Sequence, residues 1–243
     1  MHKAIILIIL SITLFMQLSG CAEHQPQEQE QQEQQKQQPV EQISDALTPG
    51  IFLEETRALI PEGVELRKVY PPGIELTKIS EGFRGRLYND AAGFCTIGYG
   101  HLIKKSACDG TEKQEFKSGI SEQQGEALLV EDMNWAKYSV MQAVSVELTD
   151  GQYAALVDFV FNVGSGNFNK STLLKKINAQ QHSEVPAQFR RWIRAGGKVW
   201  QGLVTRRERE IDLYLEGTAI PRLLPQEGEE LPDIDIRKGE LNG

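Results

Sequence analysis

Histidine and cysteine are scarce in this chain of 243 residues, which contains four histidines and three cysteines. Zinc and similar metal ions are usually bound by groups of these residues that lie a few positions apart in the sequence. No such spacing is present, because the histidines stand far apart, at positions 2, 24, 101 and 182. We therefore expect no metal centre, and no other feature of the sequence calls for a cofactor.

A long apolar run is also missing from the sequence. A membrane-spanning helix needs about 20 consecutive apolar residues, whereas the largely apolar run Ala4–Met16 has 13. This run follows a short basic start and ends just before Leu18-Ser19-Gly20-Cys21, an arrangement typical of an export signal. We therefore interpret residues 1–20 as a signal peptide.

The tetrapeptide Leu18–Cys21 resembles the lipobox of bacterial lipoproteins. The resemblance implies that Cys21 is lipidated, becomes the mature N-terminus and anchors the exported chain in a membrane. Ala22, in place of an aspartate, then favours the outer membrane if the host has two membranes. Two alternatives remain open: an ordinary signal peptide with an incidental cysteine, and a signal anchor that is not removed.

Both flanks of the central region are polar or weakly patterned. Residues 21–42 consist mainly of Gln and Glu and cannot offset the entropy of ordering by burying apolar surface, so we expect a disordered tether. Residues 43–73 contain several prolines and a predicted short helix over 52–60, without a pattern that indicates a function. Residues 221–243 are interpreted as an acidic C-terminal tail.

Two acidic residues and a threonine fall in one short central stretch. Glu81 ends a short helical pattern, and turn residues between two β-prone runs predict a hairpin that carries Asp90 and Thr96. Two carboxyl groups facing each other across a cleft can hydrolyse a glycosidic bond, because one protonates the leaving oxygen while the other activates water or attacks carbon. The spacing alone also fits a solvated hairpin without catalytic function.

Three separated blocks resemble, in the same order, the bacteriophage-type lysozymes of glycoside hydrolase family 24. They are the pattern E-x8-D-x5-T followed by I-G-Y-G-H-L, the block QYAALVDFVFNVGSGNFNKSTLL and the block GGKVWQGLVTRRERE. The resemblance covers about residues 74–220, interpreted as one lysozyme domain. It implies that Glu81 is the general acid, Asp90 the base and Thr96 a holder of the attacking water. It also implies inversion at the anomeric carbon, with the carboxyl groups about 6.5–9.5 Å apart.

Helical patterns dominate the sequence after the hairpin. A capping box at Ser121–Gln124 opens a long amphipathic helix that reaches Ala143, and a second box at Thr149–Gln152 opens a helix that is apolar nearly all round. Shorter helices are predicted at about 171–179, 184–194 and 205–216. The expected fold is α+β and mainly α, with one small sheet. The family resemblance implies a lysozyme-like arrangement, in which a small β-hairpin lobe and a helical lobe are joined by the long helix.

The family resemblance also implies supporting residues. It predicts an ion pair between His101 and Asp132, with two solvated side chains as the alternative. Four residues fall at family positions that line the sugar groove: Leu102, Phe161, Asn162 and Ser171. For Phe161 a place in the core is the more common outcome than a ligand contact, because the helix around it is so apolar.

Of the three cysteines, one belongs to the lipobox-like tetrapeptide and two lie in the central region. If Cys21 carries the lipid, Cys95 and Cys108 remain as a pair, and an exported protein can keep a disulfide. We therefore predict a disulfide between them, with two free thiols as the alternative.

Charge is unevenly distributed along the chain. The net charge of −8 arises in the flanks, because residues 76–220 hold 18 basic and 17 acidic residues. Within this region, residues 165–209 have ten basic and two acidic residues, which predicts either a field that steers anionic wall polymers or a solvated basic face. We expect no nucleic-acid partner.

The leading hypothesis is a monomeric, lipid-anchored muramidase. Its partner would be peptidoglycan, in which it would hydrolyse the β-1,4 bond between N-acetylmuramic acid and N-acetylglucosamine. One alternative is a lytic transglycosylase, which needs only the glutamate; another is a non-catalytic wall-binding lipoprotein. The presence of Asp90 and Thr96 beside Glu81 favours the hydrolase. In a Gram-negative host the enzyme would work at the outer membrane or in the periplasm.

Overall fold

The computed structural model describes residues 60–224, 228 and 231–240. All of them belong to one compact unit, Val40–Gly243. Residues 1–59 lie outside the described part of the chain. The interpretations that fall there are the signal peptide over 1–20, the lipidation of Cys21, the tether and, apart from Ile60, the helix over 52–60. No helix among the described residues is long and apolar enough to cross a membrane.

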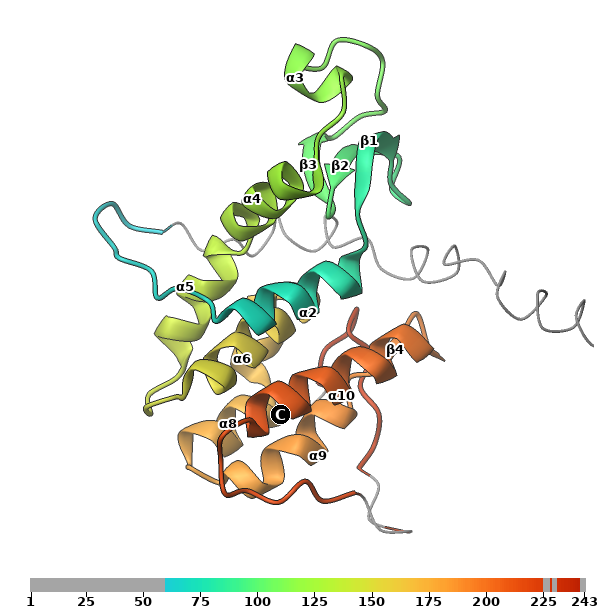
Figure 1. The fold of residues 1–243 in the computed structure, drawn as a ribbon. Coiled ribbons are helices and arrows are strands. Elements are labelled where there is room, and N and C mark those ends of the chain that lie inside the picture. The colour runs from blue at the N-terminus through green and yellow to red at the C-terminus, as the bar shows by residue number, and fades with distance from the viewer. Residues whose placement is uncertain (1–59, 225–227, 229–230, 241–243) are drawn as a thin grey trace, which may run out of the picture. The chain divides into compact units, whose positions relative to one another are not determined.

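A small antiparallel sheet forms one lobe (Figure 1). Its strands are β1 (Arg84–Asn89), β2 (Cys95–Gly98) and β3 (His101–Lys104), in the order β1-β2-β3. The predicted hairpin is thus confirmed and is extended by a third strand. Gly98, the last residue of β2, and Gly100, in the turn before β3, have φ angles of 69° and 89°, a conformation that glycine adopts without steric cost. A short helix, α3 (Gln114–Lys117), follows the sheet.

The helical lobe is built around α6 (Asp150–Val163). Every residue of this helix from Gly151 to Val163 is buried, as expected for a helix that is apolar nearly all round. The helices α2 (Pro71–Glu81), α5 (Asn134–Ala143) and α10 (Gln201–Leu215) pack against it. The smaller α7 (Ser165–Lys170), α8 (Thr172–Asn178) and α9 (Val185–Arg190), with a 3₁₀ turn at His182–Glu184, complete the lobe.

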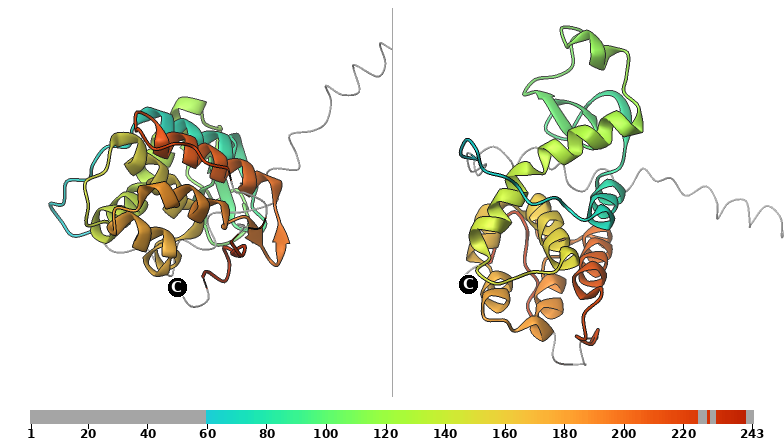
Figure 2. Two further views of the ribbon diagram at one scale, coloured as in Figure 1. Left: turned by 90° about the horizontal axis from the view of Figure 1, so that it is seen from below. Right: turned by 60° about the vertical axis from the view of Figure 1, so that its left-hand side comes forward.

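The helix α2 leads directly from the helical lobe into the sheet. It lies beside α10, and Figure 2 shows the two helices next to each other in both views. Gly73 lets α2 approach α6 closely, because a Cβ atom there would lie only 2.6 Å from the Cβ of Ala154. The last residue of α2, Glu81, is thereby held at the junction of the two lobes.

The predicted long connecting helix is present, with a break of one residue. The segment forms α4 (Glu122–Asp132) and α5, which are separated at Met133. Met133 has a ψ angle of −9°, compared with about −42° in a regular α-helix. At this break the ammonium group of Lys137 donates to the carbonyl oxygen of Val130 at 3.2 Å. The capping boxes that open α4 and α6 are both present as predicted.

The region between α9 and α10 also differs from the prediction. The helix expected over 184–194 ends at Arg190, and the helix expected from 205 begins at Gln201. A second, two-stranded sheet lies between them, with β4 (Arg194–Ala195) paired to β5 (Lys198–Val199). Gly196 and Gly197 make the turn with φ angles of 61° and 80°. Two such residues favour a tight hairpin turn. The Gly-Gly pair in the sequence therefore indicated this hairpin.

Residues 231–240, here called the C-terminal strap, pack onto the helical lobe instead of forming a separate tail. Ile234 and Ile236 belong to the hydrophobic core. The Glu240 carboxylate accepts hydrogen bonds from the backbone N–H and the hydroxyl of Thr172, at 2.7 and 2.8 Å. Because Val69 is also part of the core, the compact unit is wider at both ends than the predicted 74–220.

The basic stretch 165–209 is largely neutralised by the protein itself. Two of its arginines pair with the C-terminal strap, Arg191 with Glu240 and Arg194 with Asp233. Arg206 and Arg207 are buried in ion pairs, described below. For Arg191, Arg206 and Arg207, neither a steering field nor a solvated face is the explanation, because largely buried carboxylates meet their charges.

Candidate active site

Glu81 lies at the C-terminal end of α2, with only 4% of its side chain exposed. Gly82 follows with a φ angle of 71°, so the helix stops at this point and the chain turns into β1. The guanidinium group of Arg206 donates to Glu81 Oε1 at 2.7 Å. Burial raises the pKa of Glu81 above its usual value, although Arg206 opposes the shift.

Arg206 connects Glu81 to a buried charge cluster, which consists of Glu81, Asp158, Arg206, Arg207 and Glu210. Arg206 donates from Nε and Nη2 to the two carboxylate oxygens of Asp158 at 2.9 and 2.8 Å. Arg207 donates to Glu210 at 2.6 Å. Burial raises the pKa of Glu210, whereas Arg206 lowers that of Asp158 against the effect of burial. Two guanidinium groups face three carboxyl groups, so one bound proton makes the cluster neutral.

Sequence reasoning assigned no role to Asp158 or Arg206. A signal was present, because Asp158 is the one charged residue in the otherwise apolar stretch 153–163. A buried carboxylate requires a partner that offsets its lost hydration. The sequence could not identify that partner, since Arg206 lies 48 positions further along the chain.

Asp90 opens the turn between β1 and β2. Its Oδ1 accepts hydrogen bonds from the backbone N–H groups of Ala92 and Phe94, both at 2.8 Å. Its other oxygen, Oδ2, is buried and has no hydrogen-bond partner among the described residues. Buried polar atoms are nearly always satisfied by protein or water. The turn thus fixes the carboxylate by one oxygen, and the other is buried without a partner among the described residues.

Thr96 lies on β2, opposite Tyr88 of β1, and is 1% exposed. Its hydroxyl donates to the carbonyl oxygen of Phe94 at 3.0 Å. A hydroxyl has one hydrogen to donate and two lone pairs. Because that hydrogen is used by Phe94, Thr96 can serve a bound molecule only as an acceptor.

The Tyr88 phenol feels the charges of both predicted acids. Burial raises the pKa of Tyr88, and the guanidinium group of Arg84, 4.5 Å above the ring, opposes the shift. The negative charges of Glu81 and Asp90 both add to the rise, so both carboxyl groups lie within electrostatic reach of one phenol. The separation of about 6.5–9.5 Å between them stays a prediction. Tyr88 was not among the predicted site residues.

The four predicted groove residues are largely occupied within the protein. Phe161 is buried and stacks on Trp135, with ring centroids 6.1 Å apart. Asn162 accepts a hydrogen bond from Arg207, and buried Ser171 caps α8. Leu102 is half-buried on β3. Phe161 belongs to the hydrophobic core, and a sugar contact by the four residues stays a prediction.

The two predicted links to the sheet are present. His101 Nδ1 lies 2.8 Å from Asp132 Oδ2, which ties β3 to the end of α4. Cys95 and Cys108 form a disulfide. Within the described part of the chain, the side chains close enough to hold a metal ion are Cys95, Cys108 and Glu112. The two cysteines of this group are the ones joined in the disulfide.

A family model for phage lysozymes matches residues 78–210, more than half of the chain. The chain belongs to the phage lysozyme family. It is 39% identical over 137 residues to the SAR-endolysin of Bacteriophage PS119, an alignment that covers 56% of this chain and 77% of that relative. To the endolysin of Salmonella phage P22 it is 36% identical over 138 residues, covering 57% and 91%.

Solved structures agree with this family. A mutant of P22 lysozyme matches with a TM-score of 0.55 and 32% identity, covering 62% of this chain and 99% of that one. The muramidase domain of SpmX from Asticaccaulis excentricus matches with a TM-score of 0.53 and 30% identity, covering 61% and 98%. The predicted lysozyme-like fold is confirmed. This member of the family is a glycoside hydrolase that degrades peptidoglycan, and the matched region contains Glu81, Asp90, Thr96 and Arg206.

Proposed function

We propose that this lysozyme hydrolyses the β-1,4 bond between N-acetylmuramic acid and N-acetylglucosamine in a single displacement with inversion. Glu81 is the general acid, Asp90 the general base, and Thr96 positions the water. The observation that carries the proposal is the buried, unpartnered Oδ2 of Asp90, because an inverting enzyme needs a free carboxylate oxygen where the attacking water binds.

Burial favours the protonated form of Glu81. It raises the pKa of the buried carboxyl group above its usual value, although Arg206 opposes the shift. A protonated carboxyl group can donate to the glycosidic oxygen as the bond to the leaving sugar breaks. Arg206 contacts Oε1, which leaves Oε2 to carry the proton toward the substrate.

Asp90 and Thr96 together orient the water. Both offer acceptors, Asp90 through Oδ2 and Thr96 through a hydroxyl whose hydrogen is already donated to Phe94. A water molecule that donates one hydrogen to each has its lone pair free to attack the anomeric carbon. Asp90 takes up the proton during this attack, and its negative charge also offsets the positive charge that develops on the sugar ring.

The stereochemistry of the product tests this mechanism. NMR of the sugar released from purified peptidoglycan should show the α anomer at the new reducing end, because water attacks the face opposite the leaving group. A β anomer would overturn the single displacement and make Asp90 a nucleophile. An anhydro product would assign the chain to the transglycosylases.

We also propose that the lysozyme is exported and anchored through lipid on Cys21, with residues 21–42 as its tether; Leu18–Cys21 supports this. The proposed catalytic groups come from one chain, so we expect a monomer. Fractionation should find the wild type in membranes and the Cys21→Ser variant in the soluble fraction, with a lipid-sized mass difference between them. Equal membrane retention without a mass difference would contradict the lipid anchor.

A further inference from the structure

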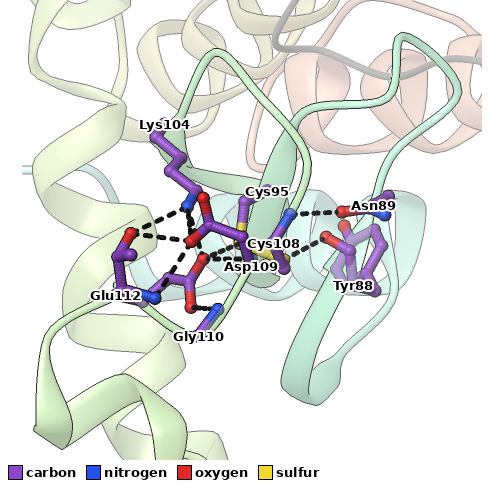
Figure 3. A network of polar contacts seen from close by, with 9 residues as sticks. Tyr88, Asn89, Cys95, Lys104, Cys108, Asp109, Gly110 and Glu112 are labelled. Atoms are coloured by element: carbon purple, nitrogen blue, oxygen red, sulfur yellow. Dashed lines mark hydrogen bonds and ion pairs between the residues drawn. A yellow bond between two sulfur atoms is a disulfide. The ribbon is translucent and has the colours of Figure 1, made fainter.

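Residues 104–113, here called the disulfide loop, lie beside the turn that carries Asp90 (Figure 3). Cys108 in this loop is joined to Cys95, and its backbone N–H donates to Asn89 Oδ1 at 2.8 Å. The loop also accepts a hydrogen bond from Cys95 N–H through the carbonyl oxygen of Ser106, at 2.8 Å. Asn89 directly precedes Asp90, and Cys95 directly precedes Thr96. The loop therefore contacts the neighbour of each residue proposed to hold the water.

The disulfide loop is itself held in place by a buried carboxylate. Glu112, whose side chain is 1% exposed, accepts from the backbone N–H groups of Asp109 and Gly110, both at 2.9 Å. It also pairs at 2.7 Å with Lys104, the last residue of β3. These contacts, that of Lys104 foremost, lower the pKa of Glu112 to about 2, so it is ionised at neutral pH. The loop is thus fastened to the sheet at one end and to the Asp90 turn near its middle.

The turn has little support of its own. The hydrogen bonds of Asp90 are made within residues 90–94, and the three residues that follow it are exposed. Local bonds of this kind fix the shape of a turn, whereas its place relative to Glu81 depends on what holds its two ends. Asn89 and Cys95 are those ends, and they pair with each other across β1 and β2.

We propose that the disulfide loop is a positioning element for the hydrolytic step: through Asn89 and Cys95, Cys108 sets the distance of Asp90 and Thr96 from Glu81. Displacement of a reacting group by about 1 Å can reduce the rate about 100-fold. Loss of the loop contacts should therefore lower kcat while substrate binding is preserved. This inference rests on the proposed function of Asp90 and Thr96.

The test uses the full chain acting on purified peptidoglycan, with kcat, KM and melting temperature measured for each variant. Asn89→Leu removes the acceptor for Cys108 N–H at similar volume and keeps the disulfide. Asn89→Asp keeps an acceptor oxygen. We expect Asn89→Leu to lower kcat about tenfold or more, with KM and melting temperature nearly unchanged, and Asn89→Asp to restore most of the rate.

Asp109→Asn is the matched control in the same loop. It weakens the exposed ion pair of Asp109 with Lys104 but leaves the disulfide and the Asn89 contact intact, so kcat should stay at the wild-type value. The Cys95→Ala/Cys108→Ala double variant should lose kcat as Asn89→Leu does. If it does not fold, the Asn89 series decides the question without it.

Three outcomes would overturn the positioning proposal. They are an unchanged kcat in Asn89→Leu, a raised KM with unchanged kcat, and an equal loss of kcat in Asn89→Leu and Asp109→Asn. Failure of the proposed function would look different, because Asp90→Asn would then keep the wild-type kcat whatever the Asn89 variants do.

Discussion

Glu81→Gln should abolish peptidoglycan hydrolysis while the fold stays intact. The amide keeps an oxygen that can accept from Arg206, so the contact at Oε1 survives, but it has no acidic proton for the leaving oxygen. A general acid contributes about 10²- to 10⁴-fold to the rate, and a loss of at least this size is expected in kcat. Circular dichroism and thermal melting would confirm the fold. Full activity of this variant would remove the lysozyme mechanism proposed here.

Glu75→Gln is the matched control for this variant. Glu75 lies on the same helix, and its side chain is 57% exposed in an ion pair with Lys78. An exposed pair of this kind contributes little, and the residue is not in the proposed site. Its activity should equal that of the wild type, which would show that an amide in α2 is not harmful in itself.

The pH dependence follows from the raised pKa of Glu81. The acid must be protonated to react, so the rate should fall as pH rises through its folded-state pKa. The stability that protonated Glu81 contributes is fully present below its ordinary pKa of about 4.5 and is lost as pH rises through the raised value. The Glu81→Gln variant should lack this pH-dependent contribution to stability when its melting temperature is measured at a series of pH values. An unchanged pH dependence would contradict the assignment.

Asp90→Asn should be nearly as severe, with an expected loss in kcat of about 10²- to 10⁴-fold. The amide oxygen can take the place of Oδ1 and keep the bonds from Ala92 and Phe94, so the turn should persist. The amide nitrogen then stands where Oδ2 was, and a donor replaces the acceptor that orients the water. The developing positive charge on the sugar also loses its counter-charge.

Two comparisons sharpen the Asp90 result. Thr96→Ala removes only one of the two acceptors for water, so its loss in kcat should be smaller than that of Asp90→Asn. Asp90→Ala removes the turn bonds as well, and should lower the melting temperature more than Asp90→Asn does. An Asp90→Asn enzyme with wild-type kcat would show that another group serves as the base.

Local sequence signals predicted the elements that local physics determines. The two capping boxes, the buried α6 and the β1–β2 hairpin are present as predicted, because each depends on residues within a few positions of one another. The His101–Asp132 contact and the disulfide are also present. The ion pair came from the family resemblance, and the disulfide from the count of cysteines left after the lipobox.

The features that the sequence did not predict depend on distant residues. The break at Met133 interrupts an apolar spacing that continues on both sides, so periodicity alone could not show it. The pairing of Arg206 with Glu81 joins positions 125 residues apart. In the C-terminal strap, Ile234 and Ile236 alternate with charged residues, a pattern typical of a half-buried strand. Because the surrounding residues are acidic, the whole segment was interpreted as a tail.

The C-terminal strap has a practical consequence for producing this enzyme. A shortened gene designed from the matched region 78–210 would omit two buried isoleucines and the carboxylate that meets Thr172 and Arg191. It would also omit Arg67, whose guanidinium group binds the carbonyl oxygen of Leu148 just before α6. Such a fragment exposes apolar surface where the full protein has core, which invites aggregation. A soluble fragment for crystallisation or assay should therefore start before Arg67 and extend past Glu240, with any affinity tag placed beyond that point.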